Sequence, residues 1–378
     1  MGGNKFASTY NFDTLRKSTC STVSVQDDKS NYWAPALYYK HRDTGKVELV
    51  PTDWAVYYLH RGTETNVQQF PKGFRMIAGS ATRSAMSSDP ADQAFNYHCL
   101  SYNEAPIAET YTLPKRRCPN GIRIQVMFPS CWNGRDATSA NFKDHVSYPV
   151  GTHEGGTCPT THPFRFMSIF IELLAHTEHF DYYDGAFALA TGDNVGYSSH
   201  ADFQNGWDAS PNSVLQRAIK GCTDAQARLS ECPILTASIN DDYHICRPDS
   251  KMPVEDVGIY GGLNKLPGDN PIWGGNVKKV PTGVSNNPPW GSPYSTLPSN
   301  WVKHGCINEG APSSQILICQ CSFHGSVGNI YVNAMTGDKR VDPYMYPGLC
   351  VQYCNSKGAS ARQKNPIIKT DRFPQVSA

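Results

Sequence analysis

The sequence predicts a mainly β protein of the sandwich or jelly-roll type, rich in loops, with a few helices and a small disulfide-rich module at the C-terminal end. Short runs of aromatic and β-branched residues recur at intervals of about 8–12 residues, which is typical of sandwiches and barrels. The 31 glycines and 27 prolines favour turns between such strands. None of the 13 cysteines forms a CxxC pair, which favours disulfide bonds over a zinc or redox site.

Several predicted strands lie in the first quarter of the chain. Aromatic and β-branched residues follow Trp33, and a turn at Asp43-Thr44-Gly45 separates the first two runs. The strands predicted here are residues 33–39, 47–50, 54–59 and 74–78.

The clearest strand spans residues 122–128. Apolar residues occupy its even-numbered positions, whereas Arg123 and Gln125 lie at odd-numbered positions together with Met127. This alternation predicts a half-buried strand, which Pro129 would end.

Two segments are predicted to be helical. Residues 164–180 are long, apolar and free of proline, and Pro163 stands where a helix accepts proline in its first turn. The second helix begins at Ser210, an N-cap residue followed by Pro211, and ends at Gly221.

The 378 residues are expected to form more than one unit, since single cores rarely grow this large. We expect a β-rich domain over residues 1–260. Residues 261–300 are rich in glycine, proline and asparagine, which favours a linker or an arm that packs on a neighbour. Residues 301–378 carry five cysteines and are expected to form a small disulfide-stapled module.

Charge and hydropathy narrow the classes of partner. The 34 basic and 33 acidic residues nearly cancel, which argues against a nucleic-acid or membrane-surface partner. The sequence contains no run of 18 consecutive apolar residues, so it predicts no membrane span.

The cysteines and the low proportion of charged residues predict a secreted protein. However, no signal segment follows Met1 and no N-glycosylation sequon occurs, so either the chain is trimmed or the prediction of secretion fails. The odd number of cysteines predicts at least one free thiol, an intermolecular disulfide bond, or a partner cysteine outside this chain.

The densest group of reactive side chains is Asp193, His200, Asp202 and Asp208. Carboxylates beside an imidazole can act as general acid and base, or can ligate a cation. The alternative is that aspartates in a glycine-rich loop cap their own turns.

A second group of loop residues contains His145, His153 and His162, with Asp144 adjacent. Together with His200 they could form a metal or acid/base site if the loops converge. The spacing matches no zinc pattern, so the metal and cofactor stay unknown, and the alternative is that these are isolated loop histidines.

A third group, Glu172, His176 and His179, has the spacing of one helix face and could bridge a metal. The alternative is that these residues form the solvent-exposed face of an amphipathic helix.

Four tryptophans adjoin glycine, asparagine or proline, and indoles in loops offer platforms for sugars. The alternative is core packing. These tryptophans are Trp132, Trp207, Trp273 and Trp290. The sequence contains no phosphate-binding glycine loop, nucleophile elbow or Cys/His nucleophile pattern.

A set of motifs over about residues 1–225 resembles an extracellular family, the domain-of-unknown-function family numbered nineteen ninety-six. The matching segments are Asp28–Pro35, Phe70–Ile77, Cys118–Arg123, Phe128–Gly134, Asp144-His145, Tyr148-Pro149, Cys158–Pro163, Thr191–Asp193 and Gly196–Asp208.

The resemblance implies a secreted protein, often joined to carbohydrate-binding modules, without a settled activity. It also implies that four residues at recurrent family positions share a site; these are His145, His162, His200 and Asp202. Members of the family usually carry a His-x-His pair before the glycines that are here Gly2 and Gly3. Met1 is therefore expected to lie inside the domain, with any site that needs the pair incomplete.

The tail resembles a partial WSC module, a cysteine-rich domain linked to wall polysaccharides. The similar segments are His304–Gly310 and Tyr346–Cys354. The Cys-x-Cys that usually closes such modules does not occur between the second segment and Ala378, which leaves the disulfide set and sugar binding of this module open.

These features predict a secreted glycan-associated protein that binds a cell-wall or extracellular polysaccharide and, in one version, hydrolyses it. In the hydrolytic version, the separation of the carboxyl groups decides the stereochemistry. The predicted catalytic residues are Asp193, His200, Asp202 and Asp208, and the predicted glycan contacts are Trp132, Trp207, His145 and His162. The alternative is a structural subunit of an extracellular fibre or wall layer that binds copies of itself. A metal-dependent oxidase ranks last.

Overall fold

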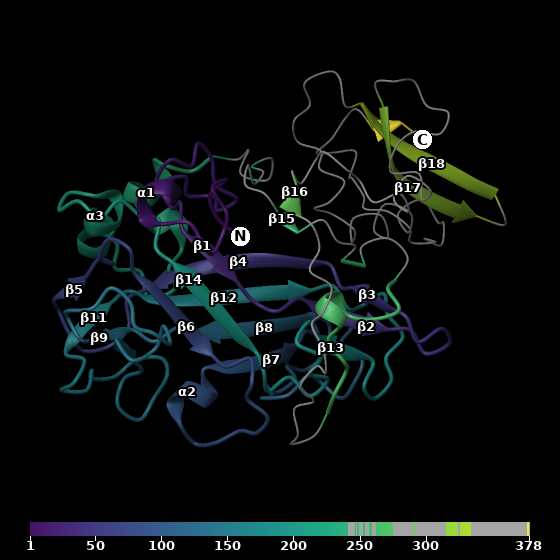
Figure 1. The fold of residues 1–378 in the computed structure, drawn as a ribbon, viewed down its shortest axis with the longest axis horizontal. Helices are drawn as coiled ribbons and strands as arrows, with labels where there is room; N and C mark the ends of the chain where they lie inside the picture. Colours follow the sequence, from purple (N-terminus) through teal and green to yellow (C-terminus); the bar gives the residue numbers. More distant parts are fainter. Residues whose placement is uncertain are drawn as a thin grey trace.

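The computed structural model describes residues 1–240, 246, 248, 257–258 and 262–274, and the backbone alone of residues 252–253, 290–291, 315–323, 326–333 and 376–377. The described chain is mainly β, as predicted, with short helices at its periphery (Figure 1).

The largest sheet, which we call the central sheet, has four antiparallel strands in the order β4-β12-β8-β7. Its strands are β4 (Thr52–Leu59), β12 (Ser168–Ala175), β8 (Ile122–Met127) and β7 (Phe95–Cys99). A second sheet, which we call the facing sheet, has the antiparallel order β1-β14-β6. Its strands are β1 (Asn31–Trp33), β14 (His200–Gln204) and β6 (Arg75–Gly79), and β14 and β6 run obliquely to β12 and β8 (Figure 1).

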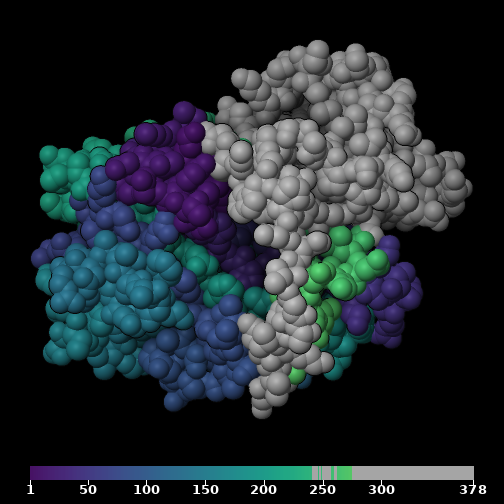
Figure 2. All heavy atoms as spheres, in the orientation of Figure 1, coloured from purple at the N-terminus to yellow at the C-terminus, as the bar shows by residue number. Residues whose placement is uncertain are grey.

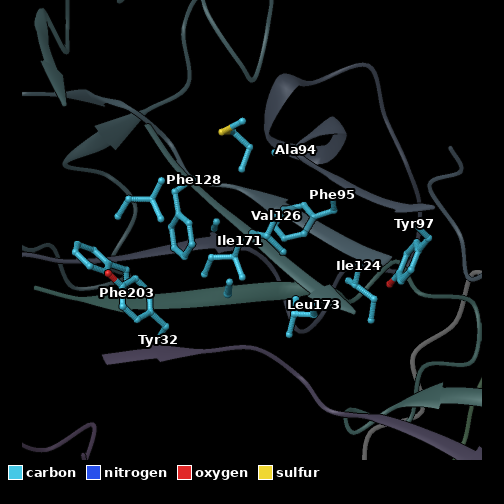
Figure 3. Close-up of a cluster of buried hydrophobic side chains, with 14 of the residues drawn as sticks. Tyr32, Ala94, Phe95, Tyr97, Ile124, Val126, Phe128, Ile171, Leu173 and Phe203 are labelled. Carbon is cyan, nitrogen blue, oxygen red and sulfur yellow. The ribbon is translucent and has the colours of Figure 1, made fainter. Parts of the chain in front are cut away.

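The core lies between these two sheets because each strand presents alternate side chains inward. The central sheet contributes rows of apolar residues such as Ile171 and Val126, and the facing sheet contributes Phe203 (Figure 3). The rings of Phe128 and Phe203 lie 6.3 Å apart across the layers. Phe128, Ile171 and Val126 are fully buried, which anchors both sheets on one hydrophobic cluster.

The remaining strands and helices surround this sandwich. A three-stranded sheet has the order β13-β2-β3, and a sheet of short strands has the order β10-β9-β11-β5. These strands are β13 (Phe187–Leu189), β2 (Leu37–Lys40), β3 (Val47–Leu49), β10 (Val146–Ser147), β9 (Cys131–Trp132), β11 (Phe164–Phe166) and β5 (Val67–Gln68). Two further sheets are described by their backbone alone. One pairs β15 (Met252–Pro253) with β16 (Trp290–Gly291), and the other has the order β17 (Gln315–Phe323), β18 (Ser326–Asn333), β19 (Val376–Ser377). The helices are α1 (Phe12–Leu15), α2 (Pro90–Gln93), α3 (Val214–Gly221) and α4 (Pro233–Thr236), with 3₁₀ turns at Leu229–Glu231 and Pro267–Asp269.

The helix predicted over residues 164–180 is wrong. The segment forms β11 and β12, in which Ile169, Ile171 and Leu173 are buried while the residues between them are partly exposed. This is the period of two that defines a strand, and it lies within an overall apolar composition that also suits a helix. Helix α3 is confirmed, but it begins after Ser213, which accepts a hydrogen bond from Gln216, rather than after Ser210.

Four disulfide bonds pair all eight cysteines whose side chains the structure describes. They are Cys20–Cys246, Cys99–Cys118, Cys131–Cys158 and Cys222–Cys232, whereas the last five cysteines of the chain lie outside the described side chains. The predicted use of cysteine in disulfides is therefore confirmed for the described part. Within it, no helix has the length and apolar character needed to cross a bilayer.

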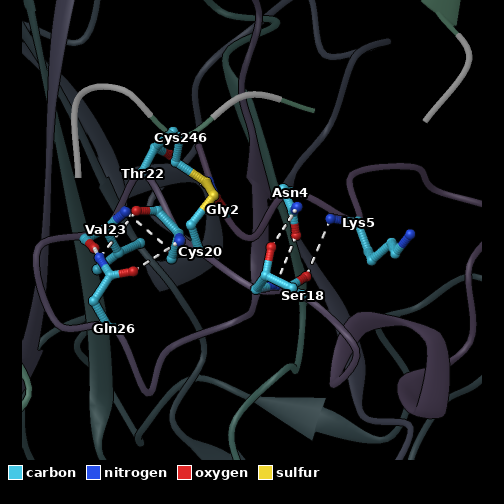
Figure 4. The surroundings of a disulfide bond; sticks show 11 residues. Gly2, Asn4, Lys5, Ser18, Cys20, Thr22, Val23, Gln26 and Cys246 are labelled. Carbon is cyan, nitrogen blue, oxygen red and sulfur yellow. Dashed lines mark hydrogen bonds between the residues drawn. A yellow bond between two sulfur atoms is a disulfide. The ribbon is translucent and has the colours of Figure 1, made fainter. Parts of the chain in front are cut away.

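Two segments distant in sequence are held against the sandwich. The bond between Cys20 and Cys246 lies beside a turn in which Gln26 accepts from Ser21 and donates to the carbonyl of Val23 (Figure 4). Figure 2 shows the N-terminal segment against the segment that contains α3. Residues 262–274 lie beside the N-terminal part of the chain that contains β3 (Figure 2). Leu263 pairs with Val47 of β3, and Trp273 pairs with Asp193. The predicted module at 301–378 lies outside the described side chains, and the predicted domain boundaries stay predictions.

Candidate functional site

The outward face of the central sheet carries a continuous group of polar side chains. The strand register places Glu172, Gln125 and Asn96 in one row across β12, β8 and β7. The next row contains Arg123 and His98. We call this group the sheet-face site, and it consists of Tyr57, Phe170, Glu172, Arg123, Gln125, Asn96, His98 and, from the loop beyond β7, Glu109.

The sequence places these residues outward because their neighbours must point inward. Ile122, Ile124 and Val126 fill the core, so Arg123 and Gln125 must occupy the other face of β8. Polar residues on the outer face of an antiparallel sheet are common. These, however, are only partly solvated, since Arg123 is 29% exposed, Glu172 is 19% exposed and Gln125 is buried.

Arg123 is the centre of the sheet-face site. Its Nη1 lies 3.4 Å from Glu172 Oε1, and its Nη2 lies 3.8 Å from Glu109 Oε1. Its Nη2 also lies 3.1 Å from His98 Nδ1. One guanidinium thus holds two carboxylates and an imidazole around it, and the partial burial strengthens these interactions.

Gln125 completes the contacts of Arg123. In the amide orientation that satisfies both of its ends, the Gln125 oxygen accepts from Arg123 Nε at 2.9 Å and Nη2 at 2.8 Å. Its nitrogen then donates to Glu109 Oε1 at 3.2 Å and to Asn96. The Arg123 side chain is therefore fixed in direction rather than free to sample solvent.

His98 presents a donor outward. Because Arg123 can only donate, His98 Nδ1 must accept, and the ring proton must lie on Nε2. None of the described residues forms a hydrogen bond with His98 Nε2, and the side chain is 22% exposed. This N–H group is available to a ligand at the surface.

Tyr57 and Phe170 form the aromatic end of the site. Their ring centroids lie 5.8 Å apart, and both side chains are half-buried. The Tyr57 hydroxyl donates to Glu172 Oε2 at 3.2 Å. Burial, and then the charge of Glu172, raise the pKa of Tyr57, so the hydroxyl stays a donor at neutral pH.

This arrangement suits a ligand with many hydroxyl groups. Planar guanidinium, amide and carboxylate groups can each engage two neighbouring hydroxyls, and an aromatic ring can stack on an apolar sugar face. Glu109 lies near Nη2 of Arg123 and Glu172 lies near Nη1, so the guanidinium charge offsets the repulsion between the two carboxylates.

The residues singled out from the sequence fall into several separate places. Asp193 is fully buried, and its carboxylate accepts from the backbone N–H groups of Val195, Gly196 and Ser198 at 2.6–2.9 Å. Trp273 is buried beside it and donates to the Thr191 carbonyl at 3.1 Å. Both side chains therefore stabilise a turn.

Asp208 and Trp207 also have structural partners. The Asp208 carboxylate accepts from the backbone N–H of Ser210 at 3.0 Å and from its hydroxyl at 2.7 Å. Trp207 is 2% exposed and donates to the Tyr58 hydroxyl at 2.7 Å. The side chain of Trp290 lies outside the described residues.

His200 and Asp202 do share a face. They alternate on β14 with the buried Ala201 and Phe203, so both point away from the core. Burial raises the pKa of Asp202, while the positive potentials of His200 and Lys143 oppose that rise. This pair is the part of the predicted catalytic group that the fold brings together with side chains directed outward.

His145 and His162 meet in another place, on the loops beside β9 and β10. His162 Nε2 lies 3.1 Å from the carbonyl oxygen of Asp144, and Trp132 pairs with Val146. His145 is 1% exposed, and burial lowers its pKa. Lys143, on the same loop, donates to the Gly79 carbonyl at the end of β6, next to His200 in the register. The loop thus runs from one predicted pair toward the other.

The third predicted group is split by the strand. Glu172 belongs to the sheet-face site, whereas His176 lies 2.8 Å from Asp53 and 3.3 Å from Glu178. Hydrogen bonds to these two carboxylates raise the pKa of His176 to about 9. His179 lies 3.4 Å from Glu178, and burial lowers the pKa of His179. Burial also lowers the pKa of His153.

No metal site emerges from these residues. Within the part of the chain that the structure describes, no three histidine, cysteine, aspartate or glutamate side chains are grouped so that they could hold a metal ion.

Most of the sheet-face site cannot be read from the sequence. The alternation in residues 122–128 places Arg123 and Gln125 on one face of a strand, but nothing in one strand shows which strands flank it. Asn96 and His98 alternate with buried residues in the same way on β7, and this period of two is the signal that could have found them.

Comparison with known families identifies the chain. The family described as "Domain of unknown function (DUF1996)" matches residues 1–207. The chain belongs to this family. No curated protein and no solved structure matches it.

All four strands of the central sheet lie within the DUF1996 match, so the sheet-face site is part of that domain. Helices α3 and α4 follow it. The sequence-based assignment to the family is thereby confirmed, whereas the resemblance of the tail to a WSC module stays a prediction.

Proposed function

We propose that the protein is an extracellular glycan-binding protein and that the sheet-face site is its binding surface. One observation carries this proposal: side chains from all four strands and one loop form a single polar network around Arg123, partly exposed and bordered by aromatic rings. Such a network combines fixed hydrogen-bonding groups with a stacking surface, which is what a polyhydroxylated ligand requires.

The disulfides support the extracellular part of the proposal. Four bonds in the described residues suit an oxidising compartment, since cytosolic thiols are kept reduced. The predicted WSC-like module would add a second sugar-binding unit, and His200 with Asp202 would add a second contact on the facing sheet.

An array of cell-wall oligosaccharides, followed by calorimetry with the oligosaccharides that bind, tests the proposal. Arg123→Ala should weaken binding by about 10-fold or more, because charge-assisted hydrogen bonds to the ligand and to the neighbouring side chains are lost. Arg116→Ala, at an exposed arginine of the preceding loop, is the matched control and should bind as the unmodified protein does.

Binding that survives Arg123→Ala, in a variant with an unchanged circular dichroism spectrum, would contradict the assignment of this face. No binding to any oligosaccharide would contradict the function itself. The alternative function, a fibre subunit, stays a prediction, and concentration-dependent association in sedimentation velocity would support it instead.

A further inference from the structure

The sheet-face site holds one negative charge that is not balanced. It contains two carboxylates, Glu109 and Glu172, and among the described residues Arg123 is the only lysine or arginine that pairs with either of them. His98 Nδ1 lies 3.8 Å from Glu109 Oε1, but the ring is neutral because this nitrogen accepts from Arg123. The site should therefore attract cationic sugars and repel anionic ones.

Glu109 is the carboxylate that a ligand can reach most easily. Its side chain is 45% exposed, whereas that of Glu172 is 19% exposed. Glu172 Oε2 already accepts from the Tyr57 hydroxyl, and Glu109 Oε1 accepts from the Gln125 amide. In the part of the chain that the structure describes, no donor forms a hydrogen bond with Glu109 Oε2. A donor on a ligand therefore finds a free, charged acceptor on this oxygen.

The loop at residues 151–156 adds negative charge beside Glu109. Burial lowers the pKa of His153, and the charges of Glu154 and Glu109 oppose this effect, so the loop lies close to Glu109. The lowered pKa keeps the His153 ring neutral near pH 7, and Glu154 is exposed. The loop contains no lysine or arginine, so it brings an anion and no cation to this edge of the site.

Two further cations near the central sheet have other partners. His176 is protonated at neutral pH, because hydrogen bonds to Asp53 and Glu178 raise its pKa to about 9. Arg117 donates to the backbone carbonyl of Glu178 at 3.5 Å. Neither cation pairs with Glu109, so the negative charge of the sheet-face site is left for a ligand.

We propose that the sheet-face site selects glycans with free amino groups, such as oligomers of glucosamine. The protonated amine contacts Glu109 Oε2, a neighbouring hydroxyl accepts from His98 Nε2, and the sugar ring stacks on Tyr57. The rings of Tyr57 and Phe170 also suit a cation, which the π electrons of an aromatic face attract. This inference rests on the proposed glycan binding and names the class of glycan.

An acidic glycan fits this site poorly. The Arg123 guanidinium already contacts both carboxylates and the Gln125 oxygen. The carboxylate of a uronic acid would therefore lose its hydration next to two anions, without a free cation to pair with. An N-acetyl group, which replaces the charged amine by a neutral amide, loses the attraction to Glu109 without adding repulsion.

The test is calorimetry of the full chain with tetramers of glucosamine, glucose, N-acetylglucosamine and galacturonate, at about pH 6 so that the amine is mostly protonated. The glucosamine tetramer should bind about threefold more tightly than the glucose tetramer, or better, because it gains one exposed charge pair. The galacturonate tetramer should bind most weakly. Added salt should narrow these differences, since it screens charges at the surface.

The variant Glu109→Gln locates the selectivity. It keeps the size of the side chain and an oxygen that accepts from Gln125, but it removes the charge. The glucosamine tetramer should then bind no more tightly than the glucose tetramer, whose own affinity should change by less than about twofold. Glu231→Gln, at an exposed glutamate of the 3₁₀ turn Leu229–Glu231, is the matched control and should leave both affinities unchanged.

The outcomes separate this inference from the proposed function. Equal binding of the glucosamine and glucose tetramers, lost in both cases in Arg123→Ala, would overturn the selectivity and keep the glycan-binding face. Tightest binding of the galacturonate tetramer would overturn the assigned charge preference. A preference for glucosamine that persists in Glu109→Gln would overturn the role of Glu109. Absence of binding by all four tetramers would overturn the selectivity together with the function on which it rests.

Discussion

The segment at residues 192–208 and the outer face of the central sheet both carry acidic and aromatic side chains, but these side chains have different partners. In the turns before and after β14, Asp193 and Asp208 accept hydrogen bonds from backbone groups a few residues away. On the sheet face, Glu172 and Glu109 contact side chains from other strands. A high density of reactive residues along the sequence therefore indicates local turn formation here, whereas the residues that converge in space are spread over about 115 positions.

The largest effect is expected for Asp193→Ala. Asp193 is fully buried, and the substitution leaves three backbone N–H groups without their acceptor, so the free energy of unfolding should fall by about 3 kcal/mol. Urea denaturation measures this change. Asp184→Ala, at an exposed loop aspartate, is the control and should change stability by less than about 0.5 kcal/mol. If Asp193→Ala kept full stability and lost glycan binding instead, the turn that contains Asp193 would have to be regarded as a binding site.

A smaller effect is expected from the pH dependence of His176, which follows β12. Its pKa is raised to about 9 by hydrogen bonds to Asp53 and Glu178, from an ordinary value of 6.5. A raised pKa means that the folded state holds the proton more tightly. The stabilisation is therefore complete below about pH 6.5 and is lost as the pH rises through about 9.

Because Asp53 is largely exposed, solvent screening should reduce this contribution to about 1 kcal/mol. The unmodified protein should lose that stability between pH 6.5 and 9, and His176→Gln should show a flatter profile in the same window. An NMR titration that finds an unshifted imidazole would contradict the contacts to the two carboxylates.

The smallest effect is expected for Tyr57→Phe, and it tests the sheet-face site most directly. The ring next to Phe170 stays, while the hydroxyl that donates to Glu172 is removed. Glycan affinity should fall by about threefold, with little change in stability. Tyr57→Ala should reduce affinity further by removing the stacking surface. Tyr102→Phe, at a tyrosine that is 69% exposed, should have no effect. Equal affinities of Tyr57→Ala and the unmodified protein would exclude a stacking role for this ring.

The strand and helix predictions show where sequence patterns succeed. Residues 122–127 form a strand whose even-numbered residues are buried, because alternation allows only one orientation on a hydrophobic core. The sequence predicts a helix over residues 164–180, because apolar side chains such as Phe170 and Leu174 also occupy outward positions in β12, which weakens the alternation. A buried apolar run is compatible with the period of a helix and with that of a strand, and the segments that pack against it decide which of the two forms.

The sequence by itself determined the mainly β character, the use of cysteine in disulfides and the face on which Arg123 and Gln125 lie. These follow from local preferences and from a period of two residues. Only the tertiary structure decided that β12 inserts between β4 and β8, which places Glu172 beside Arg123 and Tyr57. Strand order depends on how all apolar faces are buried together, and that is a property of the whole chain rather than of any segment.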